Sequence, residues 1–153
     1  SLQKSIKPML AILRDVFHLI YPSLCIGCQE EAIANSQLFC ASCEAILPMA
    51  DFHLIEDNEA MLRMVGGPNY VFGASMFRFY PDGMMQDIIH RIKYKGQTDI
   101  AFKLGRRYGE QLLNLTKLQD LHCIIPVPLH RKKQQIRGYN QSTYFADGLS
   151  QSL

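Results

Sequence analysis

The stretch Leu24-Cys25-Ile26-Gly27-Cys28, followed by Phe39-Cys40-Ala41-Ser42-Cys43, places two C-x-x-C pairs with eleven residues between them. Each C-x-x-C turn brings two thiolates close enough to hold one tetrahedral ion, and four thiolates make a closed zinc site with Zn–S bonds of about 2.3 Å. Gly27 relieves strain in the first turn and allows amide hydrogens to face the sulfur atoms. We therefore predict a structural Zn²⁺ site whose ligands are Cys25, Cys28, Cys40 and Cys43.

Other uses of these cysteines remain open at this stage. Two disulfides would suit an exported protein, a redox C-x-x-C normally comes as one pair, and an iron–sulfur cluster needs the same four thiolates. The sequence shows no export signal, and the apolar stretch 9–20 is too short and too charged to span a bilayer. We therefore expect a reducing, cytoplasmic environment, which favours zinc. Cys123 is expected to be a small core residue.

Composition places the chain among globular proteins. Of its 153 residues, 48% are hydrophobic and 20% are charged, and the net charge is +2. Such a length accommodates one domain, or a small domain and part of another. Because the net charge is small, a preference for phosphate or nucleic acid would have to come from a local cluster of cations.

The order of patterns along the chain predicts an α/β organisation (α+β within these residues). An amphipathic helix over 1–21 precedes the cysteine module, 22–50, and either packs on the protein or docks on a membrane or partner. A turn at Gly66–Pro68 leads into residues 70–153, which we expect to form part of a parallel-sheet domain. There we predict strands at 70–80 and, buried, at 123–129, and helices at 84–94, 101–115 and 141–153.

The segment Ile124-Ile125-Pro126-Val127-Pro128-Leu129 leads directly into a cationic loop. Two prolines end the predicted strand, and the carboxyl end of a parallel strand is where α/β folds bind ligands. Gly138 permits an unusual turn, and a helix begins near Asn140, whose exposed amides would add to an anion site. The cationic-type residues of the loop are His130, Arg131, Lys132, Lys133 and Arg137. The pattern predicts a phosphate-binding corner, and a solvated basic loop is the alternative.

Three segments together resemble the ComF family, which joins a zinc-ribbon module to a type I phosphoribosyltransferase domain. The cysteine pairs are the first segment, and Ile89-His90-Arg91-Ile92-Lys93-Tyr94-Lys95-Gly96 is similar to a helix end of that family. The third is Ile125-Pro126-Val127-Pro128-Leu129-His130 with Arg137-Gly138-Tyr139-Asn140-Gln141-Ser142. The resemblance covers most of residues 9–150.

The resemblance implies pyrophosphate-releasing phosphoribosyl transfer of the amidophosphoribosyltransferase-like type in the intact protein, and a link to competence for DNA uptake. It implies that one loop binds the pyrophosphate group of phosphoribosyl pyrophosphate together with Mg²⁺. It gives no residue a catalytic role. Those binding residues are Val127, Pro128, Leu129, His130 and Arg131, and the signature adds Arg137 and Asn140. Lys93 and Lys95 would contribute positive charge nearby.

The chain departs from that family at one point. The acidic pair with a threonine- and glycine-rich loop, which such transferases use for the ribose 5-phosphate, does not occur in the sequence. We therefore expect a C-terminally truncated, inactive fragment whose open sheet edge invites oligomerisation. The alternatives are a non-enzymatic zinc protein that binds single-stranded DNA, and an interaction module that docks on DNA-uptake proteins.

Overall fold

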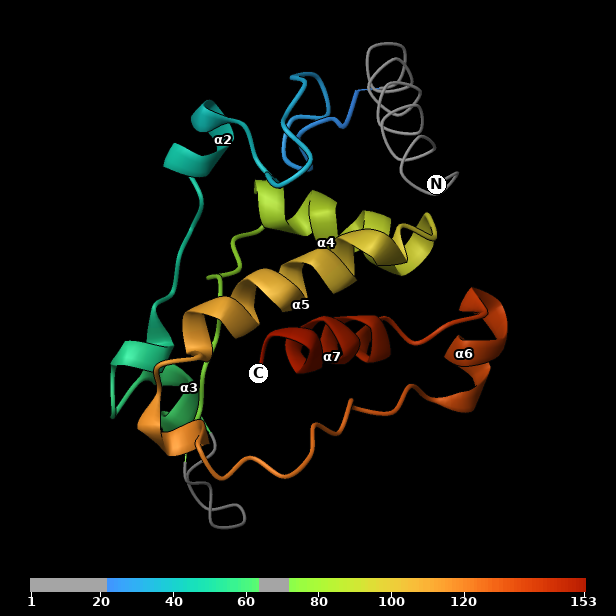
Figure 1. The fold of residues 1–153 in the computed structure, drawn as a ribbon. Helices are drawn as coiled ribbons and strands as arrows, with labels where there is room; N and C mark the ends of the chain where they lie inside the picture. Colours follow the sequence, from blue (N-terminus) through green and yellow to red (C-terminus); the bar gives the residue numbers. More distant parts are fainter. Residues whose placement is uncertain (1–21, 64–71) are drawn as a thin grey trace, which may run out of the picture. The chain divides into compact units, whose positions relative to one another are not determined.

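The computed structural model describes residues 22–63 and 72–153 and divides into two compact units, one ending at Ile46 and the other beginning at Leu47 (Figure 1). The predicted N-terminal helix over 1–21 and the predicted turn at Gly66–Pro68 lie outside the described residues. Each unit is described below by itself.

The described part of the first unit, residues 22–46, is a short loop structure closed by one helical turn. An antiparallel bridge pairs Leu24 with Ala32, and the amide of Cys25 donates to the carbonyl of Glu31 at 2.8 Å. The second cysteine pair opens α2, Ala41–Ala45. Buried side chains are few here, which is expected of so short a segment.

The second unit is mostly helical. The predicted helices at 84–94 and 141–153 are confirmed, and the helix predicted at 101–115 begins and ends three residues earlier. The bounds are η1 Phe52–Leu54, α3 Glu59–Leu62, α4 Met84–Tyr94, α5 Thr98–Leu112, η2 Thr116–Leu118, α6 Arg131–Arg137 and α7 Gln141–Ser152.

Helices α5 and α7 run side by side in the same direction and approach backbone to backbone (Figure 1). A Cβ atom on Gly105 would overlap the carbonyl oxygen of Phe145, and one on Gly148 would overlap that of Phe102. At Gly109 it would lie 2.7 Å from the Cβ of Ser152. Glycine is therefore required at this crossing because any side chain would separate the two helices.

The apolar faces predicted from the helical spacing are buried. Met85, Ile88 and Ile92 of α4 are 7% exposed or less. Tyr108 and Leu112 of α5 form a buried cluster with Met76, and partly buried side chains surround it: Phe77, Leu115, Leu118, Phe145 and Leu149.

Neither predicted strand forms part of a sheet in the described residues. The first predicted strand makes a single bridge, between Phe77 and Met49. Segment 121–130 is extended without a strand partner, and Ile125 and Val127 are 81% and 74% exposed. The predictions of a buried strand and of a core position for Cys123, which is exposed, are therefore wrong for this structure. A strand requires a neighbour, and no described segment provides one along 121–130.

The cationic loop is also partly helical. Residues Arg131–Arg137 form α6, with His130 as its N-cap and Gly138 as its C-cap at φ 77°. Arginine, lysine and glutamine are good helix formers, and no glycine or proline occurs among these seven residues. The unusual turn predicted at Gly138 is confirmed.

We expect Gly148→Ala to destabilise the second unit. In a solvent-exposed helix, this change would stabilise by about 0.5–1 kcal/mol because alanine is the better helix former. Here the methyl group would meet the Phe102 carbonyl, and overpacking of this kind costs about 1–3 kcal/mol. Urea unfolding followed by circular dichroism would measure the change. Glu110→Ala on the exposed side of α5 is the control, and an unchanged or raised midpoint for Gly148→Ala would contradict the close contact.

Candidate functional site

The four cysteines of the first unit form a compact group of donors. Their sulfur atoms all lie within 4.8 Å of one another, and the sulfurs of Cys28 and Cys40 are 4.0 Å apart. With Zn–S bonds of about 2.3 Å, the edge of a ZnS₄ tetrahedron is about 3.8 Å. The group fits a single ion such as zinc after small movements, which confirms that the two C-x-x-C pairs converge.

Backbone amides hold the first turn against the sulfur of Cys25. The amides of Gly27 and Cys40 donate to this sulfur at 3.3 and 3.2 Å. The carbonyl of Cys25 accepts from the amide of Gln29, a residue with left-handed φ of 62° that closes the turn. The amide contacts predicted around Gly27 are thus present, and Phe39, which precedes Cys40, is buried.

The same contacts divide the cysteines by acidity. Burial disfavours the thiolate of Cys25, but the amides of Cys40, Cys28 and Gly27 outweigh it and lower its pKa to about 6. Burial raises the pKa of Cys43. Neighbouring thiolates repel one another, so the four groups cannot all ionise without a compensating cation. A divalent metal ion supplies that compensation.

In the second unit, Asn140 joins two of the segments assigned to pyrophosphate binding. Its Nδ2 donates to the carbonyl of Val127 at 3.0 Å, and its Oδ1 accepts from the amide of Ser142 at 3.1 Å. Both ends of the side-chain amide are therefore engaged within the protein, where Asn140 caps α7 and holds the end of the extended segment.

Two neighbouring residues tie the same region to α4. The hydroxyl of Tyr139 donates to the carbonyl of Ile92 at 2.6 Å and accepts from the amide of Gly96 at 3.2 Å. Arg137 donates to the hydroxyl of Tyr94 at 3.3 Å, and its guanidinium lies 4.8 Å from the centre of that ring. It also donates to Oε1 of Gln141 at 3.2 Å.

The remaining residues of the predicted phosphate-binding corner include three exposed cations. Nδ1 of His130 accepts from the amide of Lys132 at 3.3 Å, which caps α6. Arg131, Lys132 and Lys133 are exposed, as are Val127 and Pro128, while Leu129 is half-buried. The structure therefore brings Val127 and Asn140 together and places the cations on the adjacent short helix. The contacts made by Tyr139 and Tyr94 had no signal in the sequence beyond the place of both residues inside the two resembling motifs.

Comparisons of the chain with models of known protein families, with curated proteins and with solved structures give no match. Within the described ranges, no helix combines the length and the apolar character needed to cross a bilayer.

We expect one metal ion per chain, held by the four cysteines. Because Cys25 is fully buried and receives two amide hydrogen bonds, Cys25→Ser should remove the ion and loosen residues 22–46. Metal content by mass spectrometry of the native protein would measure the loss. Cys123→Ser is the matched control, since it changes an exposed cysteine outside the group and should retain one ion. Equal metal content in the two variants would contradict the assignment.

Asn140→Ala should lower stability even without any ligand. It removes the cap of α7 and the bond to Val127, and loss of such a cap costs about 1 kcal/mol. Thermal unfolding of this variant and of Gln135→Ala, an exposed α6 residue, would measure the difference. If Asn140→Ala unfolds like the wild type, the side chain does not have the structural role described here.

Proposed function

We propose that the first unit is a structural zinc module and that the second is the N-terminal part of a phosphoribosyltransferase-like domain of the ComF type. The convergence of the four sulfur atoms within 4.8 Å carries the first part of this proposal. A closed S₄ site leaves no open coordination position, so the ion would stabilise the fold and take no part in a reaction. The small core of residues 22–46 makes such support necessary.

The contacts around α6 support the proposal that the second unit is part of a phosphoribosyltransferase-like domain. The tie between Asn140 and Val127 holds the predicted pyrophosphate loop beside the start of α7. Arg137 and Tyr139 anchor that loop to the end of α4, so the signature residues act as positioning residues. Contact with a pyrophosphate would then fall to Arg131, Lys132 and the main-chain amides near Leu129. Fixed charges of this kind favour pyrophosphate as a leaving group by electrostatic stabilisation.

The intact protein would release pyrophosphate from phosphoribosyl pyrophosphate, bound with Mg²⁺, as the sugar is transferred. The motif for the ribose 5-phosphate does not occur in the 153 residues, so this chain should bind the pyrophosphate group without catalysing transfer. A second candidate function is binding of single-stranded DNA, favoured by the exposed cations of α6 and by the edge-on pair of Tyr139 and Tyr144, 6.3 Å between ring centres.

We expect Mg²⁺-pyrophosphate to bind the chain saturably, as measured by titration calorimetry. Arg131→Gln should weaken binding at least tenfold, because a charge-assisted hydrogen bond contributes about 1.5–3 kcal/mol. Arg106→Gln, which removes an arginine on the exposed side of α5, is the control and should change little. Absence of binding, or equal effects of the two substitutions, would contradict the proposal. Salt-sensitive binding of a single-stranded oligonucleotide in its place would favour the second candidate.

A further inference from the structure

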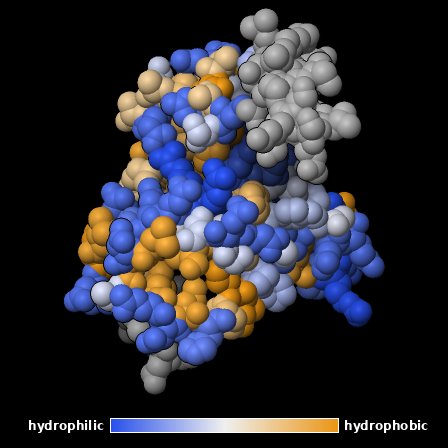
Figure 2. All heavy atoms as spheres, viewed as in Figure 1, coloured by the Kyte–Doolittle hydropathy of each residue, from blue (hydrophilic) through white to orange (hydrophobic). Residues whose placement is uncertain are grey.

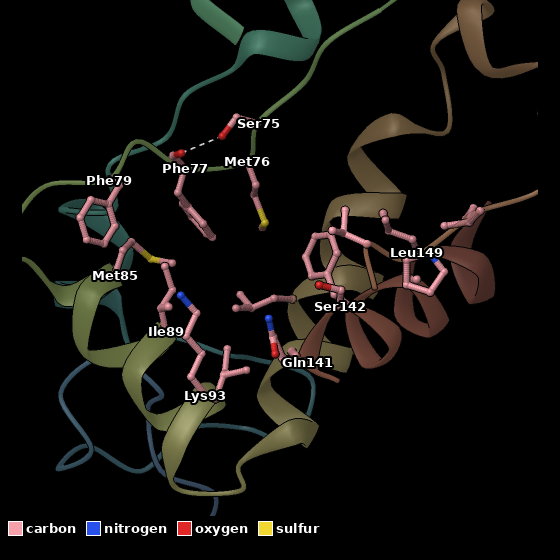
Figure 3. A pocket seen from close by; sticks show the side chains of 18 of the residues that line it. Ser75, Met76, Phe77, Phe79, Met85, Ile89, Lys93, Gln141, Ser142 and Leu149 are labelled. Carbon is pink, nitrogen blue, oxygen red and sulfur yellow. Dashed lines mark hydrogen bonds between the residues drawn. The ribbon is translucent and has the colours of Figure 1, made fainter. Parts of the chain in front are cut away.

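The second unit contains an apolar cavity of about 550 Å³ (Figure 3). Helices α4, α5 and α7 provide part of its wall, through residues such as Met85, Leu104 and Phe145. Two extended segments, 75–79 and 124–127, provide the rest. Figure 2 shows hydrophobic residues gathered on the surface over α7 and the extended segment before α6, where the surface is hollowed.

Segment 124–127 belongs to neither a helix nor a turn, and no described strand lies beside it. Its side chains alternate, with Ile124 and Pro126 half-buried and Ile125 and Val127 exposed. Its one hydrogen bond within the described residues is the bond from Asn140 to the carbonyl of Val127. The amides of Ile124, Ile125 and Val127 thus have no protein partner in the described chain, and neither do the carbonyls of Ile124, Ile125 and Pro126. Such a row of free donors and acceptors is a template for pairing with another strand.

Segment 75–79 is already paired along one edge. The carbonyl of Met76 accepts from Ala50 at 3.1 Å, and the amide of Arg78 donates to Pro48 at 2.7 Å. Backbone groups of alternate residues point to opposite edges of a strand. The amides of Ser75, Phe77 and Phe79 therefore belong to the opposite edge, and no described segment pairs with that edge. Both extended walls of the cavity thus have unused strand-pairing capacity.

One end of the cavity is rich in donors. Lys93 from α4 and Gln141 from α7 point into it, and the hydroxyl of Ser142 lies nearby (Figure 3). Because Oε1 of Gln141 accepts from Arg137, its Nε2 is directed elsewhere and is free to donate. Lys93 is half-buried, and its only polar neighbours along the cavity wall are neutral or cationic, since the lining contains no aspartate or glutamate. An occupant with a carboxylate at this end would complement the ammonium group.

We propose that this cavity receives an extended segment of polypeptide that pairs as a β-strand with residues 124–127. Its alternate side chains are apolar and fill the cavity, and an acidic side chain near one end meets Lys93. A strand satisfies the free backbone groups along 124–127, which neither a helix nor a small apolar molecule can do. The proposal does not depend on phosphoribosyl chemistry.

The test uses a synthetic strand peptide, acetyl-Thr-Val-Thr-Val-Thr-Asp-amide, with the whole chain. Its two valines and its aspartate share one face of the strand, as the proposal requires. We expect saturable binding and at least a tenfold slowing of amide exchange at Ile125 and Val127. Ile125→Asp should weaken binding at least tenfold, because it places a charge in the pairing strand. Ile136→Asp is the matched control, since Ile136 is 84% exposed on α6 and does not line the cavity. Neither substitution alters a buried position, so both variants should fold.

A second pair of variants tests the proposed contact between Lys93 and the acidic side chain of the bound strand. Lys93→Gln should weaken binding of the aspartate peptide several-fold but leave binding of its asparagine analogue unchanged. Lys95→Gln, an exposed lysine outside the cavity wall, should affect neither. Mg²⁺-pyrophosphate binding, measured on the same samples, reports on the proposed function separately, so that failure of one proposal is distinguishable from failure of the other.

Three results would overturn the proposal. One is equal affinity for a peptide N-methylated at alternate residues, which cannot form the ladder. Another is binding of octanoate in a Lys93-dependent manner with no strand-peptide binding, which would make the cavity a small-molecule site. The third is self-association of the chain through Ile125, seen by sedimentation as a dimer that Ile125→Asp dissociates and Ile136→Asp does not, which would make a second copy the occupant.

Discussion

The close contact between α5 and α7 is the constraint on which the second unit depends. Gly105 and Gly148 allow the two backbones to touch, and the hydroxyl of Ser152 adds a bond of 2.9 Å to the carbonyl of Arg106. With α7 held in this way, Phe145 and Leu149 reach the cluster around Tyr108. The start of α7 is also set, and with it the position of Asn140.

That position gives the signature residues a role that their chemistry alone does not suggest. Arginine and asparagine in a loop are usual ligands for phosphate. Here, however, Arg137 donates hydrogen bonds to Gln141 and Tyr94, and Asn140 donates one to Val127. Together with Tyr139 they hold the end of the extended segment and the end of α4 against α7. The exposed cations of this corner, Arg131, Lys132 and Lys133, lie on α6. Their positions therefore depend on the contacts that anchor the two ends of this short helix.

The two units are stabilised by different means. The second buries continuous helical faces, so the hydrophobic effect supplies most of its stability. The described part of the first has one short helix and few buried side chains, and its contacts converge on sulfur atoms. An ion bound by the four cysteines would therefore stabilise its fold.

Local patterns in the sequence determined the cysteine group and the three longer helices α4, α5 and α7. The C-x-x-C spacing was sufficient to predict the cysteine group, because a short turn brings the two cysteines of each pair together whatever surrounds it. The periodicity of Met85, Ile88 and Ile92 was sufficient for α4, since one helical face must be buried. The tertiary structure decided what becomes of residues 124–127, whose apolar, mostly β-branched side chains predicted a buried strand. A strand exists only beside another, and whether a neighbour is present is a property of distant segments that no local pattern contains.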